Sequence, residues 1–168
     1  MDLYLLRHGI AVERGTEGYE DDSQRPLTPK GERKMKQIAE GMGELGLSFD
    51  LILSSRFIRA RQTAEIVAET LKTKERLKFC AHLAPEGDSE DLVHDLTRLY
   101  HRPKSVVLVG HEPYLSNLIA TLLAGKPTLD VTLKKGGLCL LSVKSLQYGR
   151  CAVLEWLLTP RHMTRLAR

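Results

Sequence analysis

The chain contains few cysteines, and those present are far apart in sequence. Cys80, Cys139 and Cys151 are the three cysteines among 168 residues, so their number is odd and no two form a close pair. This pattern favours neither a disulfide framework nor a zinc site of the Cys-x-x-Cys type. Such cysteine usage is typical of proteins in a reducing compartment, and we therefore expect a cytoplasmic protein.

Aromatic residues, long apolar runs and excess charge are also scarce. Aromatic residues make up 5% of the chain, and 25 basic against 21 acidic residues give a formal net charge of +4. Nucleic-acid binding usually needs a basic patch and base-stacking rings, so neither value favours a nucleic-acid partner. No apolar run approaches the length of a membrane span, and no basic leader precedes the first apolar segment. We therefore expect neither membrane insertion nor export.

Hydrophobic residues are sufficient for one core. They make up 42% of the chain, which fits a single domain spanning residues 1–168. Short apolar runs alternate with amphipathic segments, and this alternation predicts a three-layer α/β/α sandwich around a central sheet. The expected strands are residues 3–6, 50–55, 77–80 and 105–110, followed by an antiparallel hairpin of residues 137–143 and 151–158. The expected helices are residues 29–45, 58–71, 89–100 and 114–123.

Local signals define several helix starts. Thr28 is expected to cap the first helix, with Pro29 at its first position, and Ser89 is expected to cap the third. Pro113 is expected at the first position of the fourth helix. The polar segment of residues 10–24 has no periodicity and is predicted to be a surface loop, and the residues from 159 onward are expected to form a short helix or a loose end.

The most informative segment is Leu3-Tyr4-Leu5-Leu6-Arg7-His8-Gly9. Its apolar run is expected for a strand covered on both faces, and Gly9 allows the chain to turn away. Arg7 and His8 then follow the carboxyl end of a strand, where open α/β sheets bind their ligands. An imidazole there can act as a general base, a metal ligand or a nucleophile, and the adjacent Arg7 favours an anionic substrate over a divalent cation.

Two other segments place similar side chains at strand ends. The clearest predicted strand leads into Gly110-His111-Glu112-Pro113, and Arg56, Arg59 and Arg61 surround the start of a predicted helix. Arginines oppose the dipole at a helix amino terminus, so a bound phosphate or carboxylate is the natural compensation, with a solvated basic face as the alternative for Arg56 and Arg61. The set predicts a phosphate site. Neither a His-Glu-x-x-His metal motif nor a Gly-x-Ser-x-Gly nucleophile motif is present in the sequence.

Short motifs are spread along nearly the whole chain in a defined order. They are Leu6-Arg7-His8-Gly9, Arg25-Pro26-Leu27-Thr28 with Gly31, Arg59-Ala60 with Gln62-Thr63-Ala64, Gly110-His111-Glu112-Pro113, and Trp156-Leu157-Leu158-Thr159-Pro160. In this order they resemble the histidine phosphatase superfamily, which is phosphoglycerate-mutase-like, and within it the small bacterial SixA-type phosphohistidine phosphatases. The resemblance implies the strand order of that family and a mixed, mainly parallel sheet.

The resemblance also implies a role for each matching residue. His8 matches the nucleophile of the family, which becomes transiently phosphorylated. Arg7, Arg59 and His111 match the groups that hold the phosphoryl oxygens. Two guanidinium groups and an imidazole can neutralise charge on three equatorial oxygens, so we expect neither a metal nor another cofactor.

The roles of Arg25 and Glu86 are less defined. Arg25 is expected either to add positive charge to the site or to be a surface residue. Mutases and ester phosphatases of the superfamily carry an acidic residue that protonates the leaving oxygen, and Glu86 in Ala84-Pro85-Glu86-Gly87-Asp88 is the candidate here. A phosphohistidine substrate relaxes this need, because an imidazole already protonated on its free nitrogen leaves readily.

The leading hypothesis is a monomeric, metal-independent phosphohistidine phosphatase that acts on a signalling or phosphotransfer protein. Short connections leave little chain for a deep lid, and a shallow cleft suits a protein side chain. Two alternatives stay open. One is a phosphomonoesterase for a small phosphorylated metabolite, with His8 as nucleophile and Glu86 as acid. The other is a phosphohistidine-binding module without turnover.

Overall fold

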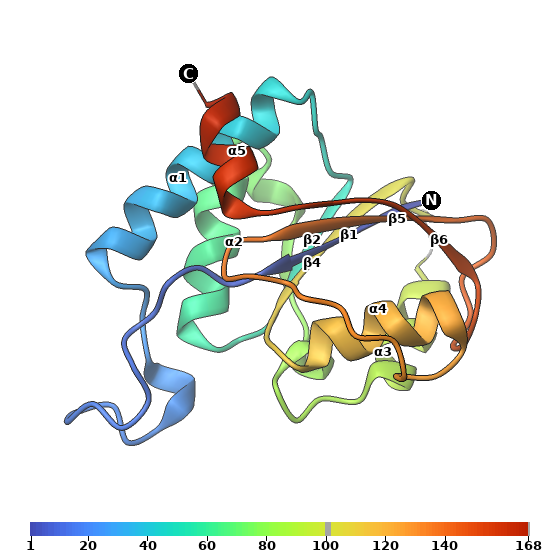
Figure 1. Cartoon of the computed structure of the whole chain (residues 1–168), viewed down its shortest axis with the longest axis horizontal. Helices are drawn as coiled ribbons and strands as arrows, with labels where there is room; N and C mark the ends of the chain where they lie inside the picture. Colours follow the sequence, from blue (N-terminus) through green and yellow to red (C-terminus); the bar gives the residue numbers. More distant parts are fainter. Residues whose placement is uncertain (100–101, 168) are drawn as a thin grey trace.

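A six-stranded sheet organises the molecule (Figure 1). In the computed structural model, which describes residues 1–99 and 102–167, the strand order is β3-β2-β4-β1-β5-β6. The strands are β1 (Asp2–Arg7), β2 (Leu51–Ser54), β3 (Leu77–Phe79), β4 (Ser105–Gly110), β5 (Leu138–Val143) and β6 (Ala152–Leu158). The first four pair in parallel, whereas β5 pairs antiparallel with both β1 and β6. The mixed, mainly parallel sheet is therefore confirmed.

Helices cover both faces of this sheet, which confirms the three-layer α/β/α prediction. They are α1 (Pro29–Glu44), α2 (Ile58–Thr70), α3 (Ser89–Thr97), α4 (Tyr114–Ala124) and α5 (Pro160–Leu166), with short 3-10 turns η1 (Asp22–Gln24), η2 (Lys74–Arg76) and η3 (Ala81–Leu83). Figure 1 shows α3 and α4 on one face of the sheet and α1, α2 and α5 on the other. Within the described residues, no helix combines the length and the apolar character needed to cross a membrane.

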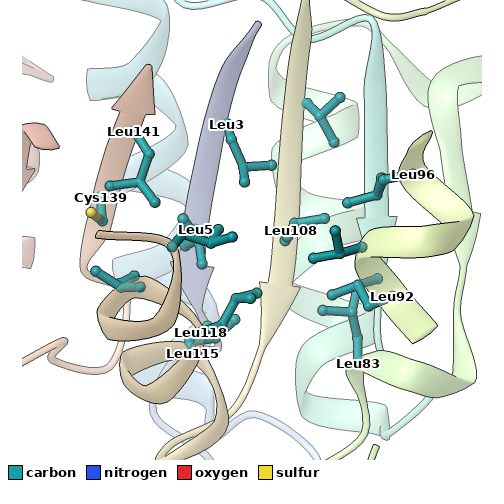
Figure 2. Packing of buried hydrophobic residues seen from close by; sticks show 14 of the residues in the cluster. Leu3, Leu5, Leu83, Leu92, Leu96, Leu108, Leu115, Leu118, Cys139 and Leu141 are labelled. Atoms are coloured by element: carbon teal, nitrogen blue, oxygen red, sulfur yellow. The ribbon is translucent and has the colours of Figure 1, made fainter. Parts of the chain in front are cut away.

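Each face of the sheet has its own apolar core, because successive side chains of a strand point to opposite faces. Leu3 and Leu5 of β1 are buried with residues of α3 and α4, as Figure 2 shows. Tyr4 and Leu6 of the same strand are buried with residues of α1 and α2. A strand in the middle layer must be apolar at every position, which explains the continuous apolar run before Arg7.

The start of α1 follows its local signals. The Thr28 side chain accepts a hydrogen bond from the Gly31 N–H group at 3.0 Å, and Pro29 occupies the first helical turn. The C-terminal residues form α5 and not a loose end, and Thr159 caps this helix.

Two other helix starts differ from the prediction. The cap of α3 is Asp88 and not Ser89, because the Asp88 carboxylate accepts hydrogen bonds from the backbone N–H groups of the first turn. Pro113 is the residue before α4 and not its first helical residue. The helix α3 ends at Thr97, and its predicted end at Tyr100 lies outside the described residues.

The contact between α1 and α5 depends on a glycine. A Cβ atom added at Gly41 would lie 2.2 Å from the backbone oxygen of Met163, whereas one added at Gly43 would meet only Leu71 Cδ2 at 3.6 Å. Both glycines lie in α1, so the two positions differ mainly in what surrounds them.

We predict opposite effects for alanine at these two glycines. Gly41→Ala is expected to lower the free energy of unfolding by about 1–3 kcal/mol, because α5 must move away. Gly43→Ala is expected to raise it by about 0.5–1 kcal/mol, because alanine favours the helical backbone. Urea denaturation of both variants measures these changes. Equal effects would show that α5 does not pack closely on α1.

Candidate active site

The carboxyl ends of three neighbouring strands bring the candidate site together. His8 follows β1, Ser55 follows β2 and His111 follows β4, which lies between the other two strands. The pairing continues past the strand ends: the His8 N–H donates to the Gly110 oxygen, and the Ser55 N–H donates to the Val109 oxygen, each at 3.0 Å. The backbones of His8 and Ser55 are therefore both held against the end of β4, which leads directly into His111.

A pocket of about 290 Å³ opens at this edge of the sheet. Its lining residues are Arg7, His8, Glu13, Arg14, Arg25, Arg59, Pro85, His111, Glu112 and Lys135. The structure thus brings Arg7, His8, Arg25, Arg59 and His111 to one place. Five of the lining residues are arginines or a lysine, so the pocket suits an anion.

Glu86, the candidate acid, does not line the pocket, although the preceding Pro85 does. Pro85 and Glu86 are the two central residues of a turn that is closed by a hydrogen bond from the Gly87 N–H to the Ala84 oxygen, 2.9 Å long. The carboxylates that do line the pocket belong to Glu13 and Glu112. One oxygen of Glu112 already accepts a hydrogen bond from the Ser116 N–H at 3.0 Å.

The imidazole of His8 is buried and held in one orientation. It is 6% exposed, and its Nδ1 lies 2.7 Å from the Gly9 carbonyl oxygen, which can only accept a hydrogen bond. Nδ1 must therefore carry the proton, and Nε2 is unprotonated with its lone pair as an acceptor. Nε of Arg59 donates to this Nε2 at 3.3 Å, which agrees with the assignment. Nε2 is the nitrogen that can attack an electrophile.

The surroundings of His8 keep its ring neutral. Burial lowers the pKa of His8 well below 6.5, and the neighbouring His111, Arg59 and Arg7 lower it further, against the opposing effect of the hydrogen bond to Gly9. Burial also lowers the pKa of His111 to about 3, and Arg59, Arg25 and Arg7 add to this effect, whereas Asp22 opposes it. Both imidazoles are therefore uncharged at neutral pH.

A buried threonine connects the segment that carries His8 to Arg59. The Gly9 N–H donates to Thr63 Oγ1 at 3.1 Å, and the Thr63 hydroxyl donates to the Arg59 carbonyl oxygen at 2.7 Å. Gly9, whose carbonyl orients His8, is therefore tied to the first turns of α2. Thr63 is 0% exposed, and its hydroxyl completes both hydrogen bonds without water.

Arg59 is oriented by an acidic residue that sequence analysis did not single out. Its Nη2 atom donates to Asp22 Oδ2 at 2.8 Å, and its Nη1 atom donates to the Asp22 backbone oxygen at 2.6 Å. Arg25 and Arg14 bind the other carboxylate oxygen of Asp22, at 2.8 Å and 3.1 Å. One carboxylate therefore binds three arginines of the pocket. The signal in the sequence was the acidic run of residues 17–22, but nothing in it indicated a partner.

The loop of residues 10–24 delivers Asp22 to this position. Its two ends are joined by a short bridge between Ala11 and Leu27 and by a hydrogen bond from the Val12 N–H to the Pro26 oxygen, 2.9 Å long. Arg25 Nη1 also donates to the Val12 oxygen, which holds the loop closed. The loop thus both carries the anionic partner and forms one wall of the pocket.

Arg7 is fixed from the opposite side. Its Nη1 atom donates to the Leu133 oxygen at 3.0 Å, and the Gly136 N–H donates to the backbone oxygens of Arg7 and His8 at 3.0 Å and 3.2 Å. Gly136 has a φ of 77°, which favours glycine. Among the described residues, the buried Nε atom of Arg7 has no hydrogen-bond partner, so this arginine retains a donor for a ligand.

The remaining candidate side chains lie outside the pocket. Arg56 is exposed, and Arg61 is half-exposed and pairs with Glu65 at 3.4 Å. The arginine cluster at the start of α2 therefore divides: Arg59 faces the site, and the other two face solvent. His101 lies outside the described residues. Within residues 1–99 and 102–167, no group of three or more His, Cys, Asp or Glu side chains could hold a metal ion.

Comparison with known families agrees with this geometry. Residues 3–100 match the family described as the histidine phosphatase superfamily (branch 1). The chain belongs to the histidine phosphatase superfamily. The matched region includes His8, Arg25 and Arg59, whereas His111 lies beyond it.

Similar proteins match most of the chain. An uncharacterized protein of Picosynechococcus is 40% identical over 139 residues, or 82% of each chain. The phosphohistidine phosphatase SixA of Escherichia coli K12 is 29% identical over 127 residues, which are 75% of this chain and 76% of SixA. A solved structure of the protein histidine phosphatase SixA complexed with tungstate has a TM-score of 0.80 and 25% identity, and covers 97% of this chain and 99% of that one.

We predict that Asp22→Asn lowers stability and changes its dependence on pH. Burial alone would raise the pKa of Asp22, but hydrogen bonds from Arg14, Arg25 and Arg59 hold it well below its ordinary value of 3.8. Because the folded pKa is below the unfolded one, the stabilisation is fully present above 3.8 and is lost as the pH falls further. At neutral pH the variant is expected to lose about 1.5–3 kcal/mol.

Urea denaturation between about pH 2.5 and pH 7 checks this prediction, because the range includes the ordinary pKa of 3.8, below which the carboxyl binds a proton in the unfolded chain but not in the folded one. The free energy of unfolding should decrease less between neutral and acidic pH in Asp22→Asn than in the parent. Glu17→Gln is the matched control, because Glu17 is exposed in the same loop. A curve for Asp22→Asn that is parallel to the parent curve would contradict the role assigned to Asp22.

Proposed function

We propose that this histidine phosphatase superfamily protein is a metal-independent phosphohistidine phosphatase that acts on a histidine-phosphorylated protein. The observation that carries the proposal is the state of His8. Its Nδ1–H donates to the Gly9 oxygen, its unprotonated Nε2 accepts a hydrogen bond from Arg59 Nε, and the ring lies among Arg7, Arg59 and His111. This arrangement supplies a nucleophile together with donors for the oxygens of a phosphoryl group.

In the first step, His8 Nε2 attacks the phosphorus atom in line with the leaving nitrogen. A P–N bond to His8 forms, the P–N bond of the substrate breaks, and the bonding electron pair stays with the substrate nitrogen. Arg7, Arg59 and His111 would neutralise the charge on the three equatorial oxygens. The Nε–H group of Arg59, which donates to His8 Nε2 in the free site, becomes available to these oxygens once Nε2 binds phosphorus.

In the second step, a water molecule attacks phospho-His8. The water oxygen bonds to phosphorus, its proton passes to a phosphate oxygen, and the electron pair of the P–N bond returns to Nε2. The Gly9 carbonyl keeps Nδ1 protonated, so the ring departs as a neutral imidazole and not as an anion. Inorganic phosphate then leaves.

A histidine substrate removes the need for a strong acid in both steps. The leaving group of the first step is an imidazole protonated on its other nitrogen, and so is the leaving group of the second. This symmetry fits a pocket that Glu86 does not line and in which Glu112 already accepts a hydrogen bond from α4. An ester substrate would leave as an alkoxide and would need a proton donor.

The pocket is also small and accessible to a side chain on a protein surface. Its volume is about 290 Å³, and exposed Arg14 and Lys135 lie among its lining residues. The similarity of the chain to SixA of Escherichia coli, a phosphohistidine phosphatase by name, supports the same substrate class. A small phosphorylated metabolite is the alternative substrate.

One assay tests both the substrate class and the role of His8. A protein phosphorylated on histidine with phosphoramidate and a panel of phosphomonoesters are incubated side by side with the enzyme in excess chelator, and released phosphate is measured. We expect release from the phosphoprotein, and a loss of about 10³-fold or more in His8→Ala. Preference for an ester, lost in Glu86→Gln, would instead establish a phosphomonoesterase. Tight binding of the phosphoprotein without release would indicate a binding module.

Arg59 and Arg61, two arginines in the first turn of α2, should differ in their effect on turnover. Arg59→Ala is expected to lower kcat/KM for the phosphoprotein by about 10²- to 10³-fold, because a buried donor to the phosphoryl oxygens is lost. Arg61→Ala is the matched control and should leave turnover unchanged, because Arg61 pairs with Glu65 at the surface. Equal losses in the two variants would refute the assignment of Arg59 to the site.

A further inference from the structure

Ser55 lies beside the second imidazole of the site. It directly follows β2, and His111 directly follows β4, the parallel neighbour of β2. The Ser55 Oγ atom is 2.9 Å from His111 Nε2, and both residues are buried, at 0% and 2% exposure. The Ser55 N–H also donates to the Val109 oxygen at 3.0 Å, which holds the Ser55 backbone beside β4.

The direction of this hydrogen bond follows from the partners of the Ser55 hydroxyl. The Phe57 N–H donates to Ser55 Oγ at 3.3 Å, so the oxygen already accepts one hydrogen bond. Among the described residues, His111 Nε2 is the one acceptor within reach of the hydroxyl hydrogen. A buried hydroxyl with an unpaired hydrogen is unfavourable by about 1–3 kcal/mol, so the hydroxyl donates and Nε2 accepts.

The other ring nitrogen then carries the proton. His111 Nδ1 is buried and has no hydrogen-bond partner among the described residues. We propose that Ser55 is a positioning residue that fixes His111 as the Nδ1–H tautomer, so that this N–H is the donor which His111 offers to a phosphoryl oxygen. The inference rests on the proposed function for its ligand, whereas the tautomer itself does not depend on the substrate.

Different neighbours thereby give the two imidazoles complementary roles, one as an acceptor of phosphorus and the other as a hydrogen-bond donor. In His8 the Gly9 carbonyl accepts from Nδ1–H and leaves Nε2 as a lone pair for attack. In His111 the Ser55 hydroxyl donates to Nε2 and leaves Nδ1–H as a donor. With the ring centroids 5.1 Å apart, one imidazole can bind phosphorus while the other binds an oxygen on it. The opposite tautomer of His111 would present a lone pair to that oxygen and repel it.

Nuclear magnetic resonance tests the tautomer directly. Long-range ¹H–¹⁵N spectra of the ¹⁵N-labelled wild-type chain at neutral pH should show a protonated Nδ1 and an unprotonated Nε2 for His111. Addition of inorganic phosphate should shift the Nδ1–H signal. A wild-type ring protonated on Nε2, or on both nitrogens, would overturn the proposal. So would an Nδ1–H signal that phosphate at saturation does not move.

Substitution of Ser55 tests whether the hydroxyl is responsible. In Ser55→Ala, the His111 signals should move toward a mixture of tautomers, and kcat for the phosphoprotein should fall about 10-fold with KM little changed. Ser54→Ala is the matched control: Ser54 is equally buried, but its hydroxyl donates to the Ser55 carbonyl oxygen at 2.9 Å and not to His111. Unchanged His111 signals in Ser55→Ala would refute the role of Ser55.

The outcomes for the tautomer and for the proposed function are separable. If the wild-type chain releases phosphate from none of the substrates while His111 shows the Nδ1–H tautomer, the proposed function fails and the tautomer assignment stands. If phosphate release occurs but His111 is protonated on Nε2, the proposed function stands and the role of Ser55 fails. If Ser55→Ala does not fold, the wild-type spectra and the phosphate titration alone decide.

Discussion

The parallel pairing of β4 with both β1 and β2 is the constraint on which the site depends. The backbone hydrogen bonds continue one residue past the strand ends, to His8 from β1 and to Ser55 from β2. Three side chains with little freedom of movement therefore meet at one edge of the sheet. The two apolar cores that hold the strands also exclude water from the rear of the site, because β1 is buried from Leu3 to Leu6. The strand pairing and packing that stabilise the fold therefore also determine the geometry of the site.

Burial of the two imidazoles determines how the groups of the site can act. Burial lowers the pKa values of both imidazoles, so they are neutral, and a hydrogen bond must decide which nitrogen of each ring carries the proton. The Gly9 carbonyl decides this for His8, and the Ser55 hydroxyl decides it for His111. Neutral rings also leave the arginines and Lys135 as the positive charges of the site, which suits a dianionic phosphoryl group. A charged His8 would lack the lone pair that attack requires.

The arginines themselves need an anion when no ligand is bound. Asp22 supplies it for Arg59, Arg25 and Arg14, and its backbone oxygen binds Arg59 as well. Buried guanidinium groups without a partner would strongly destabilise the fold. The loop before α1 therefore keeps the arginines oriented. Nε of Arg7 and Nδ1 of His111, which have no partner within the described part of the chain, retain hydrogen-bonding capacity.

The sequence by itself determined the layers of the fold and the positions of His8 and His111 at strand ends. These features depend on local patterns, since an apolar run before Arg7 or His111 specifies a buried strand wherever it lies in the sheet. The N-cap of α3 also depends on local sequence, but the adjacent residues Asp88 and Ser89 can both cap a helix, and in the structure Asp88 does so. Only the tertiary structure decided the partners of these groups. Asp22 and Arg59 are 37 residues apart, and His111 and Ser55 are 56 apart. Such pairs depend on the path of loops and on strand order, which periodicity does not encode.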